Sequence, residues 1–301
     1  MTLTKWYFVF TFMILFINHN LSASEFKIAV RAHNGIDDAF IQWQSTVDFL
    51  NIQLTAHNFT LIPIVSLNEI SQRVAMNEFD LILTNPSSFI EINKRSGVKA
   101  LVTLNNKRAN SALSHFGSVI FTHAKNTDIL TIKDLKDKKL MAVSEQAFGG
   151  WRVAWLEMLI QGFDPYMKLE KLLFAKSRIH SEVVYAVRDQ KVDAGVVRTD
   201  SLERMEDRGE IDMRYFRIIN NKDIKGFPFF LSTPLYPEWV LAYSKSLPVD
   251  IIKKTRRILL SIYPETKAAR EGIYMGWVEP RDYESVNLLM EKLNVGPYAK
   301  Q

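Results

Sequence analysis

Residues 144–152 read SEQAFGGWR, after the apolar run KLMAV and directly before VAWLEMLI. The chain has only 12 glycines, and two stand side by side here, with an aromatic residue on each side and Arg152 next. The pattern predicts a strand at 139–143, a loop, and a helix from about residue 151. That helix is expected to bury one face, formed by Trp151, Trp155, Met158 and Leu159.

Two interpretations of the glycine pair remain open. Ligands of open α/β sheets lie at the carboxyl ends of strands, and free N–H groups at a helix start favour an anion. Gly149 and Gly150 would then let a ligand approach the backbone closely. Ser144 could contribute a hydroxyl group and Arg152 a planar guanidinium group. Alternatively, the stretch is a tight turn in which Gly150 merely fits the packing. For Trp151 we expect packing on Trp155 rather than a place in the cleft.

The composition indicates a globular protein that is large enough for two lobes. The chain has 301 residues, 47% of them hydrophobic and 24% charged, and a formal net charge of +5. This mild basic excess suits a small anionic ligand and is too weak to indicate nucleic acid. Because cysteine is absent, disulfides, thiolate metal sites and a lipidated cysteine are excluded.

The first residues predict export. One lysine precedes the apolar run 6–17, and a polar, small-residue stretch ends at Ala23. We expect residues 1–23 to be a cleavable signal peptide and the mature chain to be periplasmic, without a lipid anchor. A retained membrane anchor is the alternative, although 12 apolar residues are short of the roughly 20 that span a bilayer.

Short β-rich runs alternate with helical patterns, which predicts α/β layers with mainly parallel strands. The candidate strands are 27–30, 60–65, 80–83, 99–104, 117–122, 139–143, 171–175, 193–197, 213–219 and 239–243. A switch between lobes is expected near 116–125 and a return near 232–245, where prolines interrupt the rhythm. Lobe 1 is therefore expected to comprise 24–116 plus 234–301, and lobe 2 to comprise 117–233.

Two helices near the end of the chain are well marked. The stretch 248–262 has an apolar face and a basic face, and we expect the basic face to be solvated helix surface rather than a binding patch. The terminal helix should end at Gly296-Pro297. Its buried face is predicted to consist of Tyr283, Val286, Leu289, Met290 and Leu293.

Polar residues follow two further strands. Asn85 follows strand 80–83 and precedes Pro86, so plain capping of the next helix is the favoured interpretation, which still leaves N–H groups for an anion. Strand 193–197 is followed by Arg198, Thr199 and Asp200, of which Thr199 or Asp200 can cap a helix.

Two histidines also follow strands. His33 comes after the first strand and His180 opens a helical pattern, so each is a candidate ligand residue or a structural side chain. No histidine pair has a metal-ligand spacing such as HxxxH, and no GxSxG, Walker or GxGxxG motif is present. The sequence therefore indicates no metal, no cofactor and no enzyme activity.

Taken together, four stretches resemble the phosphonate-binding family of periplasmic solute-binding proteins. They are FDLILTNPSSF, DLKDKKLMAVSEQAFGGWR, IHSEVVYAVRDQKVDAGVVRTDSLE and GWVEPRDYESVNLLMEKLNVGPY, and the resemblance extends from about Phe26 to Tyr298. More narrowly, they resemble the sensory domains of tetrathionate-sensor-type histidine kinases. The resemblance implies a type II periplasmic binding fold, in which two α/β lobes are joined by two crossover hinge strands and hold a small ligand between them.

The resemblance also implies which residues bind an oxyanion. Its loops match the candidates His33, Asn85, Ser144, Phe148, Gly149, Gly150, Arg152, His180, Arg198, Thr199 and Asp200. Phosphonate transporters often have aromatic residues where this chain has His33 and Asn34, which puts a phosphonate ligand in doubt. Sensor kinases continue after a GPY ending into a membrane helix and kinase domains, whereas this chain stops at Gln301 and is expected to have no kinase activity of its own.

The sequence thus favours a monomeric periplasmic protein that captures a phosphonate, phosphate ester or sulfur oxyanion. Two roles stay open: delivery to an inner-membrane ABC permease, or reporting to a separate sensor histidine kinase. A third hypothesis is a periplasmic enzyme on the binding fold that uses His180 and Asp200.

Overall fold

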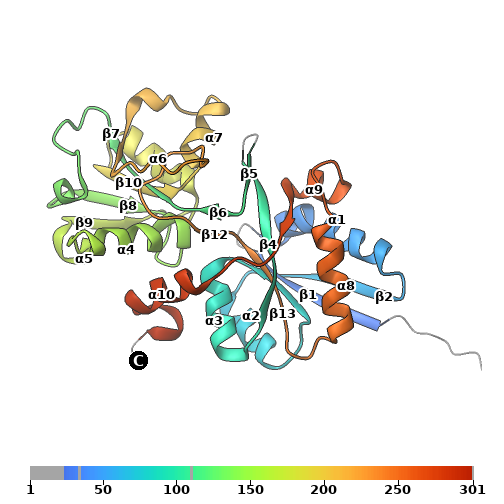
Figure 1. Cartoon of the computed structure of the whole chain (residues 1–301). Helices are drawn as coiled ribbons and strands as arrows, with labels where there is room; N and C mark the ends of the chain where they lie inside the picture. The colour runs from blue at the N-terminus through green and yellow to red at the C-terminus, as the bar shows by residue number, and fades with distance from the viewer. Residues whose placement is uncertain (1–23, 33–34, 109–110, 300–301) are drawn as a thin grey trace, which may run out of the picture.

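The computed structural model describes residues 24–32, 35–108 and 111–299. The expected signal peptide and His33 lie outside these ranges. Two sheets form the centres of two lobes (Figure 1). Within the described ranges, no helix is both long and apolar enough to cross a membrane.

Lobe 1 is built on a seven-stranded sheet of order β14-β4-β13-β3-β1-β2, with β5 beside β4. Its strands are β1 (Ser24–Arg31), β2 (His57–Ile64), β3 (Leu81–Thr84), β4 (Lys99–Arg108), β5 (Ser111–Leu113), β13 (Val240–Tyr243) and β14 (Tyr274–Val278). Its helices are α1 (Ile36–Gln53), α2 (Leu67–Ala75), α3 (Pro86–Ser96), α8 (Val249–Leu260), α9 (Lys267–Gly272) and α10 (Glu284–Lys292). One apolar core lies under α1, α8 and α9, and a second under α2, α3 and α10.

Lobe 2 is built on a five-stranded sheet of order β11-β7-β10-β8-β9. Its strands are β7 (Ser118–His123), β8 (Lys139–Ala142), β9 (Lys171–Phe174), β10 (Ala194–Arg198) and β11 (Phe216–Ile219). Its helices are α4 (Val153–Ile160), α5 (Pro165–Lys168), α6 (His180–Arg188) and α7 (Ser201–Asp207), with the π-helix η2 (Phe148–Arg152) leading into α4 and 3-10 turns η1 (Ile132–Leu135) and η3 (Met213–Tyr215). The lobes are joined where β6 (His115–Phe116) pairs antiparallel with β12 (Tyr236–Pro237).

The predicted two-lobed α/β fold is confirmed, but both sheets are mixed, and in lobe 2 β7 runs antiparallel to β10 and β11. The β1, β2 and β3 strands are parallel, as are β8 and β9, because helices connect them. In lobe 1, however, β13 and β14 run antiparallel to β4. These strands belong to the part of the chain that returns from lobe 2, so they enter the sheet from its other end. The sheet is therefore less parallel than the alternation of strands and helices predicts.

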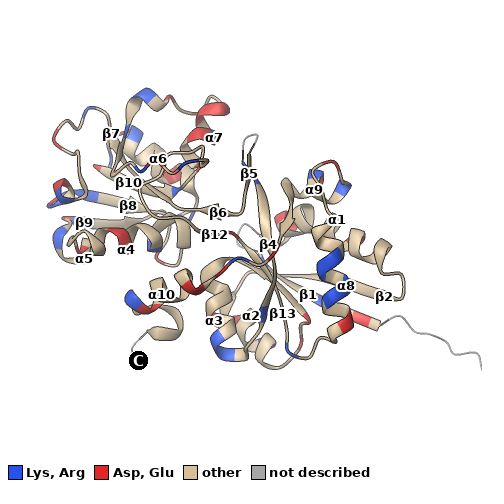
Figure 2. Ribbon diagram, viewed as in Figure 1, with Lys and Arg blue, Asp and Glu red and all other residues tan. Residues whose placement is uncertain are grey.

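The two predicted helices near the end of the chain are present. In α8 the apolar residues Ile251, Ile258 and Leu259 are buried, while its basic residues lie on the outer side (Figure 2). The terminal helix α10 buries all five of the residues predicted for it. It ends at Lys292, earlier than expected, and Gly296–Tyr298 forms a separate 3-10 turn, η4.

Candidate functional site

The loop after β8 holds the glycine pair in a packed environment. A Cβ atom on Gly149 would lie 2.7 Å from the Phe116 ring, and one on Gly150 would lie 2.6 Å from Val143. Both glycines are buried, and the Gly149 carbonyl accepts a 2.6 Å hydrogen bond from the Ser118 hydroxyl. Packing alone therefore accounts for the absence of a side chain at both positions.

The two tryptophans after the glycines are packing residues. Trp151 is fully buried, and its ring stacks on Trp155 with centroids 6.1 Å apart. This confirms the expectation that Trp151 packs rather than lines the cleft. Phe148 contacts Phe116 and Tyr236 edge-on, at centroid distances of 5.9 and 5.5 Å, so it lies against the two crossing strands.

Arg152 connects the lobes. Its Nη1 atom lies 3.9 Å from Glu91 Oε1 on α3, and its Nε donates to the Glu145 carbonyl at 3.3 Å. The residue is only 7% exposed, and burial lowers its pKa. Burial raises the pKa of Glu91, against the attraction of Arg152. Ser144, half-buried, accepts a backbone hydrogen bond from Ala147 through its carbonyl.

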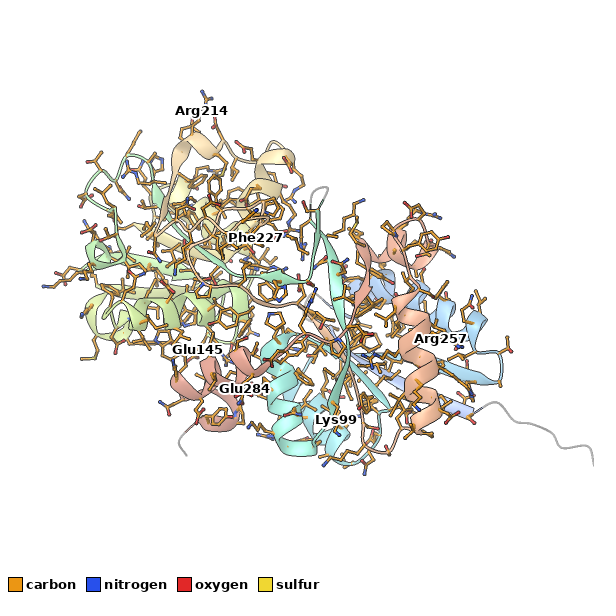
Figure 3. The ribbon with its side chains drawn as sticks, in the orientation of Figure 1. Lys99, Glu145, Arg214, Phe227, Arg257 and Glu284 are labelled. Atoms are coloured by element: carbon orange, nitrogen blue, oxygen red, sulfur yellow. The ribbon has the colours of Figure 1, made fainter. Side chains whose placement is uncertain are left out.

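Glu145 and Glu284, the first residue of α10, lie where lobe 2 faces lobe 1 below the crossing strands (Figure 3). On this side α4 and α10 are in contact, and apolar residues of both lobes form one cluster. Arg152 therefore lies beside a packed contact between the lobes and already has a carboxylate partner.

On the other side of the crossing strands lies a group that we call the interlobe charge network: Arg108, Arg198, Asp200, Arg204 and Glu238. Asp200 Oδ2 lies 3.2 Å from Arg108 Nε and 3.0 Å from Arg204 Nε, and Asp200 Oδ1 lies 3.9 Å from Arg198 Nε. Arg198 also forms an ion pair with Glu238, which lies between β12 and β13. Arg108 is the last residue of β4 in lobe 1. The hairpin of β4 and β5 extends toward α7 of lobe 2 (Figure 1).

The network is desolvated and carries more positive than negative charge. Asp200 is 1% exposed and Glu238 fully buried, yet three arginines share these two carboxylates. Burial, followed by the charge of Arg198, lowers the pKa of Arg108 to about 10. Burial alone would raise the pKa of Glu238, but Arg198 and Arg108 outweigh it and lower that pKa. The result is a buried region with a residual positive charge between the lobes.

The backbone around Asp200 is fixed by hydrogen bonds. Asp200 is the N-cap residue of α7; it adopts a left-handed conformation, φ 72°, and its side chain forms no capping hydrogen bond. Thr199 is buried, and its hydroxyl accepts from the Gly117 N–H at 3.2 Å while its own N–H donates to the Gly117 carbonyl at 3.1 Å. The sequence-based hypothesis that Thr199 or Asp200 caps the next helix is therefore wrong, because neither side chain forms a capping hydrogen bond.

Arg198 brings several predicted site residues together. Its N–H donates to His180 Nδ1 at 3.3 Å, which leaves the hydrogen of a neutral imidazole on Nε2. Its guanidinium lies over the Phe116 ring, 4.1 Å from the centroid, and its Cγ lies 3.2 Å from the position of a Cβ on Gly149. The structure thus assembles Gly149, His180 and Arg198 with Thr199 and Asp200, whereas Arg152 lies by α3 and α10.

In lobe 1, Asn85 is the N-cap of α3. Its side chain accepts from the Ser88 N–H at 2.9 Å and from the Ser87 hydroxyl at 3.0 Å. The favoured capping interpretation is confirmed.

Two charged residues between the lobes, Arg108 and Glu238, are missing from the sequence-based candidates. Glu238 had a signal in the sequence, because it directly precedes the predicted strand 239–243. Arg108 had no signal, because the strand was expected to end at residue 104. Among the described residues, no cluster of three or more histidine or carboxylate side chains could hold a metal ion.

Two α/β lobes joined by paired crossing strands have the arrangement of the type II periplasmic binding protein fold. Residues 32–285 match the family described as "ABC transporter, phosphonate, periplasmic substrate-binding protein". The chain belongs to this family.

Among curated proteins, the chain is 26% identical over 284 residues to the tetrathionate sensor histidine kinase TtrS of Salmonella typhimurium. The match includes 94% of this chain and 46% of the kinase, so the chain spans about half the length of that relative.

Solved structures share the fold at low identity. PhnD1 of Prochlorococcus marinus, in complex with methylphosphonate, has a TM-score of 0.68 at 14% identity, over 91% of this chain and 99% of PhnD1. XAC2383 of Xanthomonas citri, bound to ATP, has a TM-score of 0.67 at 16% identity, over 89% and 95% of the two chains. These family members and neighbours are binding proteins.

Proposed function

We propose that the chain is a periplasmic binding protein that captures a small oxyanion between its lobes and presents it to a membrane partner. The observation that carries the proposal is the interlobe charge network, where three arginines share two carboxylates in a desolvated region. Charge-assisted hydrogen bonds are strongest where water is excluded. The lobes 24–116 plus 234–301 and 117–233 would close about β6 and β12.

Arg198 is the proposed centre of the oxyanion site. Arg198 forms an ion pair with Glu238, next to the crossing strand β12, and it lies beside His180 and the Gly149 loop. Its side chain is 14% exposed. His33, Asn85, Ser144, Phe148, Gly150, Thr199 and Asp200 remain proposed members of the same site or of its immediate support. Arg152, which lies beside α3 on the other side of the crossing strands, remains a separate proposed ligand residue.

A thermal-shift screen tests the proposal. Phosphonates, phosphate esters, tetrathionate, thiosulfate and carboxylates are added to the purified chain, and a ligand at 100 times its Kd should stabilise it by about 2.7 kcal/mol. Arg198→Gln should lose the shift, and Arg198→Lys should retain part of it. The proposal fails if no compound shifts the wild-type protein, or if a folded Arg198→Gln protein responds in full.

The membrane partner is either an ABC permease or a separate sensor histidine kinase. The family description favours transport, whereas the similarity to TtrS favours sensing. Deletion of the gene separates these roles: a transport receptor is needed for growth on its ligand as sole nutrient source, and a sensor component is needed for transcription induced by its ligand. Neighbouring permease and ATPase genes, or kinase and response-regulator genes, would agree with the respective outcome.

The alternative of an enzyme using His180 and Asp200 has little support from the site. Asp200 is surrounded by three guanidinium groups, and His180 Nδ1 accepts a backbone hydrogen bond. Incubation with phosphate and carboxylate esters should give no product, and turnover that His180→Gln abolishes would favour the enzyme.

A further inference from the structure

Asp200 presents to the arginines of the interlobe charge network the kind of chemical group that the proposed ligand would present. Its Oδ2 atom lies 3.2 Å from Arg108 Nε and 3.0 Å from Arg204 Nε, and its Oδ1 atom lies 3.9 Å from Arg198 Nε. A carboxylate is an acceptor-only anion with its charge shared between oxygen atoms, as in a small oxyanion. The side chain therefore occupies the position that an anion between these guanidinium groups would take.

These ion pairs bring opposite charges close together without aligned hydrogen bonds. Among the described residues, neither Asp200 carboxylate oxygen has a hydrogen-bond partner, and neither do the Nε atoms of Arg108, Arg198 and Arg204, although all these atoms are buried. A strong charge-assisted hydrogen bond needs alignment as well as proximity. Because the Asp200 carboxylate is tied to the backbone by a short side chain, it neutralises charge without satisfying these donors. A free oxyanion can turn its oxygens toward them.

The backbone of Asp200 is held in an unusual conformation. Its φ of 72° is uncommon for a residue other than glycine, and its side chain forms no capping hydrogen bond with α7. Thr199, the residue before it, is fixed by hydrogen bonds to both the N–H and the carbonyl of Gly117. A strained conformation that the surroundings maintain is typical of functional positions. Here it points the carboxylate at the arginines of both lobes.

The network has both the charge and the access to take up an anion. Its three arginines face two carboxylates, so one positive charge is unmatched. The neighbouring Glu203 carboxylate accepts from the Phe230 N–H at 2.7 Å and forms no ion pair within the described part of the chain. The Arg204 side chain is 42% exposed, so solvent reaches the network from that side.

We propose that Asp200 is an internal counter-ion that competes with the ligand and thereby sets the affinity of the site for oxyanions. The inference rests on the proposed function and adds the residue that limits binding. Binding is then an exchange, in which the oxyanion pairs with Arg108 and Arg198 while Asp200 gives up these contacts. The carboxylate also repels an anion a few ångströms away, which opposes binding further. Since Arg108 belongs to lobe 1 and Asp200 to lobe 2, the exchanged ion pair is one that joins the lobes.

Isothermal titration at constant ionic strength tests the competition. The probes are inorganic phosphate, methylphosphonate, thiosulfate and tetrathionate. Asp200→Asn keeps the shape and removes the competing charge, so it should bind the probe that the wild-type protein binds best at least about tenfold more tightly. Asp200→Glu keeps the charge and should not gain affinity. Asp207→Asn, an exposed residue of the same helix, is the matched control and should change affinity by less than about twofold.

The sign of the change separates competition from support. If Asp200 only positions the arginines, Asp200→Asn weakens binding. Weaker or unchanged binding by the folded variant refutes the inference while oxyanion binding stands, and so does a gain in affinity by Asp200→Glu. If no probe binds to either protein, both proposals fail. Binding by Asp200→Asn alone supports the inference but overturns the proposed function for the wild-type protein.

Circular dichroism checks that each variant folds. If Asp200→Asn does not fold, the same charge is removed in an Arg108→Gln background, where the cation left unmatched by the loss of Asp200 is also absent. The double variant should then bind the probe more tightly than Arg108→Gln alone, and equal or weaker binding refutes the inference.

Discussion

Replacing Asp200 with asparagine removes one charge from the interlobe charge network and changes little else. The two side chains have nearly the same shape, and asparagine accepts the left-handed conformation that Asp200 adopts at φ 72°. The substitution therefore leaves the start of α7 unstrained. Its effect should report the electrostatic role of the carboxylate.

The expected loss of stability follows from burial. Asp200 is 1% exposed and the Arg108 side chain 17% exposed, so removing the carboxylate leaves Arg108 desolvated beside Arg198. Removing one partner of a buried ion pair typically costs about 3–5 kcal/mol. Arg204 is 42% exposed and can turn to solvent, which moderates the loss. We expect the free energy of unfolding to fall by about 3 kcal/mol.

Urea unfolding at pH 7, followed by tryptophan fluorescence, measures this loss. Asp207→Asn is the matched control, because Asp207 lies exposed on the same helix, and it should change stability by less than about 0.5 kcal/mol. The double variant Asp200→Asn, Arg108→Gln should recover part of the loss, since it also removes the unmatched cation. If Asp200→Asn unfolds at the wild-type urea concentration, the network does not join the lobes as described.

Three further predictions concern residues between the lobes. Arg152→Ala leaves Glu91 buried without its cation, so a loss of about 3 kcal/mol at pH 7 should shrink as the pH falls through the raised pKa of Glu91 and the carboxyl becomes neutral. Urea unfolding across pH checks this, and a loss that does not depend on pH would contradict it. Glu238→Gln should also destabilise the protein at pH 7 and do so less at low pH. The pKa of Glu238 is lowered in the folded protein, so the charged carboxylate stabilises the fold above its ordinary pKa of 4.5, and this stabilisation disappears as the pH falls through the lowered pKa. Equal destabilisation by Glu238→Gln at pH 7 and pH 3 would refute that account. Gly149→Ala would place a methyl group 2.7 Å from the Phe116 ring and should cost about 1–3 kcal/mol, and Phe116→Leu in the same chain should relieve part of that cost; additive losses from the two changes would show that the contact is not the cause.

Features that depend on residues close together in the chain were predictable from the amino-acid sequence. The apolar periodicity of α8 and α10 correctly predicts which of their faces are buried, because a helix repeats every 3.6 residues wherever it packs. The capping of α3 by Asn85 and the packing of Trp151 on Trp155 were also predictable, since each involves partners within four positions along the chain. The two-lobed arrangement of these elements was predicted from the family resemblance.

Which charged residues meet between the lobes depends on the folding of the whole chain and was not predictable from local patterns. Arg108, Asp200 and Glu238 come from three distant segments, and no local pattern relates them before the chain crosses at β6 and returns at β12. The strand β14 also depends on a long-range contact, because it is short and pairs with β4. Long-range contacts form only when the lobes assemble, and burial then fixes their charges. In SEQAFGGWR the sequence located the strand-to-helix loop, but only the packing of Phe116 and Val143 explains the two glycines.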